Sequence, residues 1–336
     1  MVTSNSNLSE QELDKLKSSI IAQIRNIKDR PFKVSIVGQT GVGKSSLINA
    51  LFNTKLKTDA VKPCTKEIEE IPITNKQGHT LLFYDLPGIG ESVEADEKYL
   101  QSYCHHLMES DVVLWAIHAD SRSVTFDLKA IHEIVNSFDK TEHAQLMSKL
   151  TLVLTKTDTL YSPPWFLLKL DESSAKFIPS QNVAEILNQK SAYYQEQFLR
   201  PYSNLIVSRT YNDCKFNIVE TNFSFDEFFV YYNGSLNTQI VSILKQKYPV
   251  YSSVFDRLYD NYQVIPCSAF FRFNLNKLLL VIVNKLGQDA VIRFRNFFDE
   301  SQLDKMPISK SKEFCNLIVY DPYKKKSLFN FQDTKF

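Results

Sequence analysis

Residues 38–45 carry the most specific chemistry in the chain, because their sequence, Gly-Gln-Thr-Gly-Val-Gly-Lys-Ser, follows the pattern G-x-x-x-x-G-K-[ST]. In such a loop glycines let backbone N–H groups converge on phosphate oxygens, Lys44 can reach the β- and γ-phosphates, and the hydroxyl of Ser45 can ligate Mg²⁺. The loop therefore predicts a nucleoside triphosphate, without specifying its base. The residues predicted to line the phosphates are Gly38, Gln39, Thr40, Gly41, Val42, Gly43, Lys44, Ser45 and Ser46.

Two flanking elements must hold this loop in place. The apolar run at Phe32, Val34, Ile36 and Val37 predicts a short strand before it, and residues 44–53 predict a helix after it. Five of the chain's eight glycines lie in this loop and in one later motif, so glycine is concentrated where backbone must approach a ligand. A strand, a loop and a helix in this order form the context that a phosphate-binding loop requires.

The second motif, Asp85-Leu-Pro-Gly88, follows the apolar run 80–84, which places Asp85 at the end of a strand. There the carboxylate can hold Mg²⁺ through a water molecule, and the N–H of Gly88 can contact the γ-phosphate. Thr65 lies between the two motifs, and we expect its hydroxyl to complete the Mg²⁺ coordination, with Thr58 as the alternative. The predicted metal ligands are Ser45, Thr65 and Asp85, and the residues predicted to act in catalysis are Lys44, Thr65 and Gly88.

A third motif, Thr155-Lys-Thr-Asp158, follows the apolar run 150–154 and indicates the base. The carboxylate of Asp158 can accept hydrogen bonds from the N1–H and N2–H₂ groups of guanine, which adenine cannot present together, and such paired polar contacts discriminate strongly. The aliphatic stem of Lys156 can lie over the purine. A fourth, shorter motif is Cys267-Ser-Ala269, in which the backbone amides of Ser268 and Ala269 can meet the guanine O6.

Composition limits the other classes of partner. The 336 residues carry a formal net charge of +1, which gives no bulk attraction for nucleic acid or an anionic membrane. The five cysteines are widely spaced, so they are expected to be reduced structural thiols rather than zinc or redox ligands. No apolar run reaches the ~18 residues of a membrane span, and no signal pattern is visible, so we expect a cytoplasmic protein without a transmembrane segment.

From residue 33 the pattern alternates between strands and helices, which predicts a mostly parallel sheet covered on both faces, with ligand loops at the carboxyl ends of its strands. The predicted strands are 33–37, 68–73, 79–84, 111–118, 150–155 and 262–266. The predicted helices are 44–53, 94–107, 123–138, 180–199 and 274–286. An amphipathic helix is also predicted at 9–29, either packing against the nucleotide domain or serving assembly or a membrane surface.

Residues 202–262 do not fit a minimal version of this fold, since they hold 14 of the chain's 42 aromatic residues. A segment so rich in aromatic residues is expected to fold, either packing onto the core or offering a partner surface. We accordingly divide the chain into an N-terminal helix at 1–30, a GTP-binding domain at 31–200 and 262–286, an insertion at 201–261 and a C-terminal extension at 287–336.

In this order the motifs resemble the translation-factor-related class of GTP-binding proteins, in its Era-like and septin-like branch, near the small bacterial GTPases called the YfjP/YeeP type. The stretches that carry the resemblance are 38–52, Cys64-Thr65, 85–92, which is also similar to that of immunity-related GTPases, and 113–120. The resemblance covers about residues 33–200 and 262–286. It implies a three-layer α/β P-loop GTPase fold, Mg²⁺-dependent hydrolysis of GTP to GDP and phosphate, and a conformational switch.

Two departures from the family pattern bear on the rate of hydrolysis. Ile89 stands where Ras-like proteins carry a glutamine that orients the attacking water, and Gly41 stands where some branches carry an asparagine that holds potassium. We therefore expect slow intrinsic turnover, accelerated by a nearby switch residue (Glu91, Ser92 or Glu94), by a homodimer across the nucleotide face or by a protein partner at the 201–261 insertion. Arg122 is a candidate for a contact in trans. The alternative is a septin-like assembly module with little turnover.

Two further functions are disfavoured. An ATP-dependent kinase conflicts with the guanine-binding pattern that ends at Asp158. An RNA-binding role like that of Era would need a following KH domain, but Gly287 is the only glycine after Ala269, so no G-x-x-G loop can occur there.

Overall fold

The chain builds a six-stranded sheet whose loops carry the predicted motifs. The structure, a computed structural model, describes residues 30–56, 58, 67–74, 78–89, 102–121, 124–160, 165–213, 215–294, 303–310, 318–321 and 326–330. The strand order is β11-β5-β4-β1-β3-β2, and only the β2–β3 pair is antiparallel. These strands are β1 (Phe32–Gly38), β2 (Glu69–Thr74), β3 (Thr80–Asp85), β4 (Val112–His118), β5 (Leu150–Thr155) and β11 (Ile265–Pro266). The prediction of a mostly parallel α/β sheet is confirmed.

The central strands form because they are almost continuously apolar. Every residue of β5 is buried, and so are all but the last of β4 and all but the first two of β1. Parallel strands that are buried on both faces of a sheet typically have such continuous apolar sequences. β2 differs because it alternates between buried and exposed residues in its second half, as expected of an edge strand.

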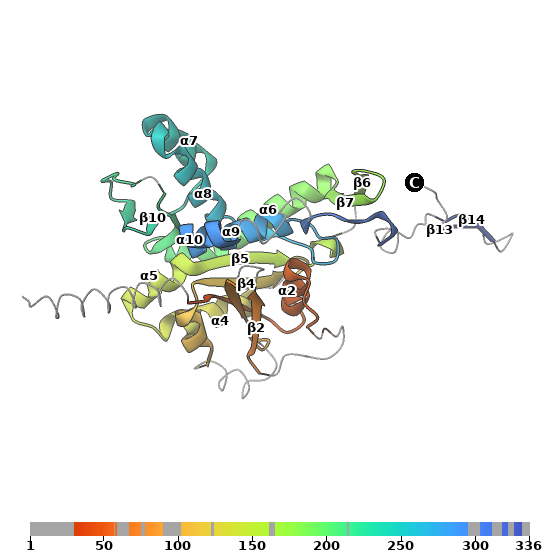
Figure 1. The fold of residues 1–336 in the computed structure, drawn as a ribbon, viewed down its shortest axis with the longest axis horizontal. Helices are drawn as coiled ribbons and strands as arrows, with labels where there is room; N and C mark the ends of the chain where they lie inside the picture. The colour runs from red at the N-terminus through yellow and green to blue at the C-terminus, as the bar shows by residue number, and fades with distance from the viewer. Residues whose placement is uncertain are drawn as a thin grey trace, which may run out of the picture.

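Helices cover both faces of the sheet, as the alternating pattern predicts (Figure 1). Two apolar clusters lie on the two faces: α2, α9 and α10 contribute to one, and α4, α5 and α6 contribute to the other. These helices are α2 (Lys44–Phe52), α4 (Thr125–Asn136), α5 (Lys140–Lys149), α6 (Gln181–Leu199), α9 (Leu275–Leu286) and α10 (Gln288–Phe294). Residues 102–109 are also helical, at the end of the helix predicted at 94–107. The helix predicted at 9–29 lies outside the described residues.

The aromatic-rich segment 202–262 forms a three-stranded antiparallel sheet and two helices. The sheet order is β8-β10-β9, and α7 and α8 project away from the main sheet (Figure 1). Its aromatic side chains, including Phe216, Phe223 and Phe255, pack into the same apolar cluster as α4 and α6. Of the two predicted roles for these rings, packing onto the core is therefore observed. The elements are β8 (Ile206–Tyr211), β9 (Phe223–Phe225), β10 (Phe229–Asn233), α7 (Thr238–Lys247) and α8 (Ser252–Tyr262).

Smaller elements complete the described chain. A third sheet, β12-β7-β6, consists of β6 (Trp165–Lys169), β7 (Ser174–Pro179) and β12 (Met306–Pro307), and β13 (Ile318–Asp321) pairs with β14 (Lys326–Asn330). Three 3₁₀ turns are η1 (Thr157–Thr159), η2 (Arg200–Tyr202) and η3 (Pro249–Tyr251). Within the described ranges, no helix has the length and apolar character needed to cross a bilayer.

Candidate nucleotide-binding site

The phosphate loop joins β1 to α2 at the carboxyl end of the sheet. Gly43 has φ = 98°, a left-handed conformation, and a Cβ there would lie 3.4 Å from Cε of Lys156. Glycine therefore allows the left-handed turn into α2, and the stem of Lys156 lies within van der Waals range of this turn. The side chain of Lys44 folds back along the loop, where Nζ donates to the carbonyl of Gly38 at 3.2 Å, and only 7% of Lys44 is exposed.

Two of the three predicted metal ligands lie in contact. The hydroxyl of Ser45 donates to Oδ2 of Asp85 at 2.5 Å, and Asp85, the last residue of β3, is fully buried. A hydroxyl and a carboxylate are oxygen ligands that suit Mg²⁺, and this ion is usually held by one or two protein groups together with substrate phosphates. Among the described residues, no group of three or more His, Cys, Asp or Glu residues forms a metal cage. Thr65 lies outside the described residues, and its alternative Thr58 is exposed.

The segment after Asp85 lies across the phosphate loop. Ile89 N donates to the carbonyl of Gly38 at 3.2 Å, and Thr40 N donates to the carbonyl of Ile89 at 3.3 Å. Gly88 fits against Thr40 so closely that a Cβ would overlap both the side chain and the backbone of Thr40. The predicted γ-phosphate contact at Gly88 is therefore placed beside the loop that would hold the phosphates.

The side chain of Ile89 points into the core rather than into the nucleotide site. It is 6% exposed and belongs to the apolar cluster that contains Leu107 and Trp115. An apolar side chain in this place neither donates nor accepts a hydrogen bond, so Ile89 does not orient a water molecule. The predicted sources of assistance at 91–94 and Arg122 lie outside the described residues.

The base motifs meet at the carboxyl ends of β5 and β11. Asp158 lies in η1, and its Oδ1 accepts a hydrogen bond from the hydroxyl of Ser268 at 2.5 Å. That hydroxyl also accepts from Phe271 N at 2.9 Å, so the short fourth motif fixes the direction of the Asp158 carboxylate. A positive φ of 53° at Lys156 turns the chain out of β5 and aims this lysine toward Gly43.

One cavity connects these motifs. It has a volume of about 620 Å³ and is lined by Gly43 and Ser46 from the phosphate loop, and by Lys156, Asp158 and Ala269 from the base motifs. This volume falls within the usual range of small-molecule sites. Several further residues line the cavity although no sequence motif predicted them, namely Asn53, Phe270, Arg272, Met306 and Lys310. They belong to no motif, and only their position next to one could have suggested them.

Two predicted contact residues use their polar side-chain groups to hold the phosphate loop in place. Gln39 Nε2 donates to Oδ2 of Asp127 at 2.5 Å, and Trp115 Nε1 donates to the other carboxylate oxygen at 3.1 Å. Burial raises the pKa of Asp127, and the two donors oppose that shift. The hydroxyl of Thr155 donates to the carbonyl of Val42 at 2.6 Å, which ties the base motif to the phosphate loop.

Comparisons with known proteins agree with this geometry. Residues 33–156 match the family model described as 50S ribosome-binding GTPase. The uncharacterized protein YkfA of Escherichia coli (strain K12) is 37% identical over 117 residues, which cover 34% of this chain and 40% of YkfA. For YfjP of the same strain the identity is 33% over 117 residues, with the same coverage of 34% and 40%. GTPase Era of Deinococcus radiodurans is 35% identical over 85 residues, or 25% of this chain and 27% of Era.

The chain thus spans less than half the length of these curated relatives. Among solved structures, Toc33 from Arabidopsis thaliana aligns at 19% identity and a TM-score of 0.39, covering 54% of this chain and 67% of Toc33. The predicted Era-like resemblance is confirmed by the family match and by the curated relatives. Residues 33–156 are thus similar to the P-loop GTPase domain family.

Proposed function

We propose that this protein binds GTP with Mg²⁺ and hydrolyses it to GDP and phosphate. The observation that carries the proposal is that one cavity is lined both by the phosphate loop, at Gly43 and Ser46, and by Asp158, whose carboxylate is held by Ser268. A nucleotide with its phosphates in the loop would bring its base to this carboxylate. Guanine offers paired N–H donors there, whereas adenine does not.

Each residue has a distinct role in the proposed reaction. Lys44 would move from the Gly38 carbonyl to the phosphate oxygens, where its ammonium neutralises charge that develops as the γ-phosphoryl group departs. Ser45 and Asp85, with Thr65, would hold a magnesium ion, which would supply positive charge beside the phosphates. Gly88 would respond to the presence of the γ-phosphate, because its segment already contacts the phosphate loop at Thr40.

We further propose slow intrinsic turnover and a conformational switch. The buried Ile89 supports slow turnover, since it leaves the attacking water without a polar partner at this place. The backbone hydrogen bonds of Ile89 to the phosphate loop support the switch, because a γ-phosphate in the loop would act directly on them. A second copy across the nucleotide face, or a partner at the 201–261 insertion, would then supply the missing assistance.

The nucleotide proposal is tested by isothermal titration calorimetry with GTP, GDP and ATP in Mg²⁺ buffer. We expect GTP and GDP to bind and ATP to bind at least about a hundredfold more weakly. Asp158→Asn should lose GTP and gain xanthosine triphosphate, whose C2 carbonyl accepts the hydrogen bond that an amide donates. Equal affinity for ATP and GTP in the unmodified protein would contradict the base assignment.

A second candidate is an assembly module in which GTP stabilises an interface and turnover is incidental. The burial of Ile89 favours this candidate as well. Turnover per chain at rising protein concentration, measured beside light scattering with GDP or a non-hydrolysable GTP analogue, separates the two. Turnover that rises with concentration supports the self-activated hydrolase, whereas nucleotide-dependent oligomers without turnover support the module.

A further inference from the structure

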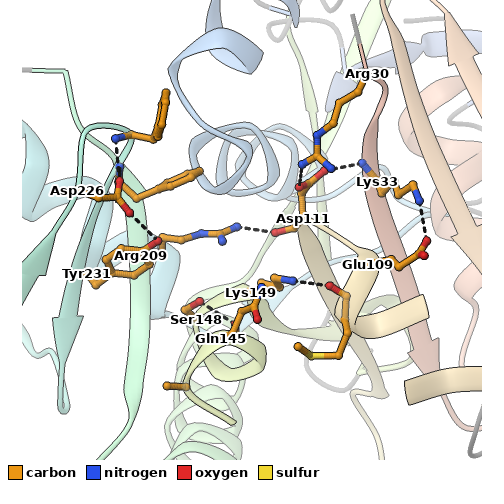
Figure 2. A pocket seen from close by; sticks show the side chains of 14 residues that line it. Arg30, Lys33, Glu109, Asp111, Gln145, Ser148, Lys149, Arg209, Asp226 and Tyr231 are labelled. Carbon is orange, nitrogen blue, oxygen red and sulfur yellow. Dashed lines mark hydrogen bonds and ion pairs between the residues drawn. The ribbon is translucent and has the colours of Figure 1, made fainter. Parts of the chain in front are cut away.

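A second cavity of about 720 Å³ lies at the opposite end of the sheet from the nucleotide site. Lys33 near the start of β1, Asp111 just before β4 and Lys149 just before β5 line it, so it opens at the amino ends of these strands. Its other wall is the small sheet of the insertion, which contributes Arg209 from β8 and Tyr231 from β10 (Figure 2). None of the GTPase motifs lines this cavity.

The carboxylates of this cavity are already engaged. Glu109 accepts from Lys33 Nζ at 2.7 Å, and Asp111 accepts from Arg30 at 2.5 Å and from the backbone N–H of Lys33 at 2.9 Å. The third carboxylate, on Asp226, accepts two backbone N–H groups of its own turn, each at 2.7 Å (Figure 2). Two ion pairs and one turn thus use all three carboxylates.

Two cations remain, and both are buried against backbone carbonyls. Lys149 is 5% exposed and donates to the carbonyl of Met108 at 2.7 Å. Arg209 is 6% exposed, and its Nη2 donates to the carbonyl of Asp111 at 2.5 Å (Figure 2). The same atom donates to the carbonyl of Lys285 at 2.8 Å. The Nε atom of Arg209 is buried and has no hydrogen-bond partner among the described residues.

The surroundings of these cations are unfavourable for positive charge. Burial, together with Arg209 nearby, lowers the pKa of Lys149 to about 8, against a smaller opposing effect of Asp111. Burial also lowers the pKa of Arg209, and this effect outweighs the opposing charges of Asp111 and Asp226. Lys285, fully buried behind β5, donates to the carbonyl of Leu150, and its pKa is well below the ordinary value because of burial and of Arg209 nearby. A carbonyl oxygen accepts a hydrogen bond from such a cation but does not neutralise its charge. A carboxylate or phosphate in the cavity could therefore form charge-assisted hydrogen bonds with these cations away from bulk water.

Aromatic side chains lie beside the two cations. The ring of Phe229 lies 4.6 Å from the guanidinium carbon of Arg209, and Phe228, also on the cavity wall, is 66% exposed. An arginine fixed against a ring presents its remaining N–H groups in a set direction. The wall therefore offers an apolar surface next to the positive charge.

We propose that this cavity binds a small organic anion, whose carboxylate or phosphate group lies between Lys149 and Arg209 and whose apolar part contacts Phe228 and Phe229. The cavity volume is in the range of metabolite sites, and it combines a few polar groups with aromatic walls, as such sites do. The site is separate from the nucleotide site, and it does not depend on which nucleotide the phosphate loop binds.

The test uses the full chain saturated with GDP and Mg²⁺, so that the phosphate loop is occupied. Phenyl phosphate, benzoate and inorganic phosphate are titrated by calorimetry. We expect phenyl phosphate or benzoate to bind more tightly than inorganic phosphate, because only the organic anions contact the rings, and the tighter of the two identifies the oxyanion. Lys149→Gln should weaken that binding about tenfold or more.

Two further variants keep the result interpretable if Lys149→Gln folds poorly. Gln145→Glu places a carboxylate at an exposed position on the cavity wall and should weaken anion binding roughly threefold without disturbing the core. Lys129→Gln, at an exposed lysine on α4 outside the cavity, is the matched control and should bind the probe as the unmodified chain does. The proposal is wrong if no organic anion binds, if both cavity variants bind like the control, or if added GTP displaces the probe.

Discussion

The hydrogen bond from Thr155 to the carbonyl of Val42 is the direct link between the base motif and the phosphate loop, and its removal gives the sharpest test of the site. Thr155 is 3% exposed, and the bond measures 2.6 Å. Thr155→Val keeps the shape of the side chain but leaves the Val42 carbonyl without this donor. An unsatisfied buried polar group costs ~1–3 kcal/mol, so the loop should be less well held by about that amount.

If about 1–2 kcal/mol of this loss falls on the nucleotide-bound state, GDP affinity should drop roughly 5- to 30-fold. Calorimetry with GDP measures the drop, and GTP should show the same factor because the two nucleotides share the loop. Thr155→Ser is the matched control: it keeps the hydroxyl and loses only a methyl group, so its affinity should stay within about threefold of the unmodified chain. Equal GDP affinity in the Val and Ser variants would refute the view that this bond positions the loop.

Three other perturbations test separate parts of the structure. Gly88→Ala should lower the free energy of unfolding by ~1–3 kcal/mol, because the added methyl group overlaps Thr40. In denaturant titrations, the additional Thr40→Ala substitution should recover part of this loss. Full stability of the single Gly88→Ala variant would contradict the observed packing. Gln39→Leu removes one of the two hydrogen-bond donors to the buried Asp127, so stability should fall by about 1–3 kcal/mol. Because the pKa of Asp127 is already raised by burial, the loss should be larger at neutral pH than in acid, where protonation relieves the carboxylate; a loss that does not change with pH would contradict this role of Gln39. Lys149 has a pKa of about 8 when folded against 10.5 ordinarily, so the unfolded chain binds more protons between these values and stability should rise with pH across that window, by up to about 3 kcal/mol. Lys149→Gln should flatten that rise, and an unchanged slope in denaturant titrations at pH 7.5 and 10 would argue against the buried charge.

The sheet was predictable because its strands are buried on both faces. β1, β4 and β5 are continuous apolar runs, and the motifs mark where each strand ends. α5 was not predicted because its first half is polar, although the capping box of Asp139 and Glu142 marks its start. Segments that pack through tertiary contacts gave no such signal: Arg209 sits in a short strand of the insertion, and nothing in its local sequence indicates that it is buried.

The directions of the side chains within the site could not be predicted from the sequence either. Gln39 and Thr155 belong to recognisable motifs, yet their side chains bond to Asp127 and to Val42. A motif specifies which backbone must approach the ligand, because that requirement restricts residue type at each position. A motif does not specify the direction of a polar side chain that can also form a hydrogen bond with a buried group from another element.

These same contacts explain how the loop can be ready for phosphate before any nucleotide is present. Thr155 holds it from β5, Gln39 ties it to α4 through Asp127, and Ile89 pairs with it through two backbone hydrogen bonds. The first two contacts involve side chains that a phosphate does not need, so nucleotide binding can leave them intact. Only the Ile89 contact lies where a γ-phosphate would act, since it joins Gly38 and Thr40 to the segment that contains Gly88. In the proposed function, a loop held on two sides by side chains and on the third by Ile89 would bind GDP and GTP through the same contacts. The difference between the two nucleotides would then be confined to the segment after Asp85.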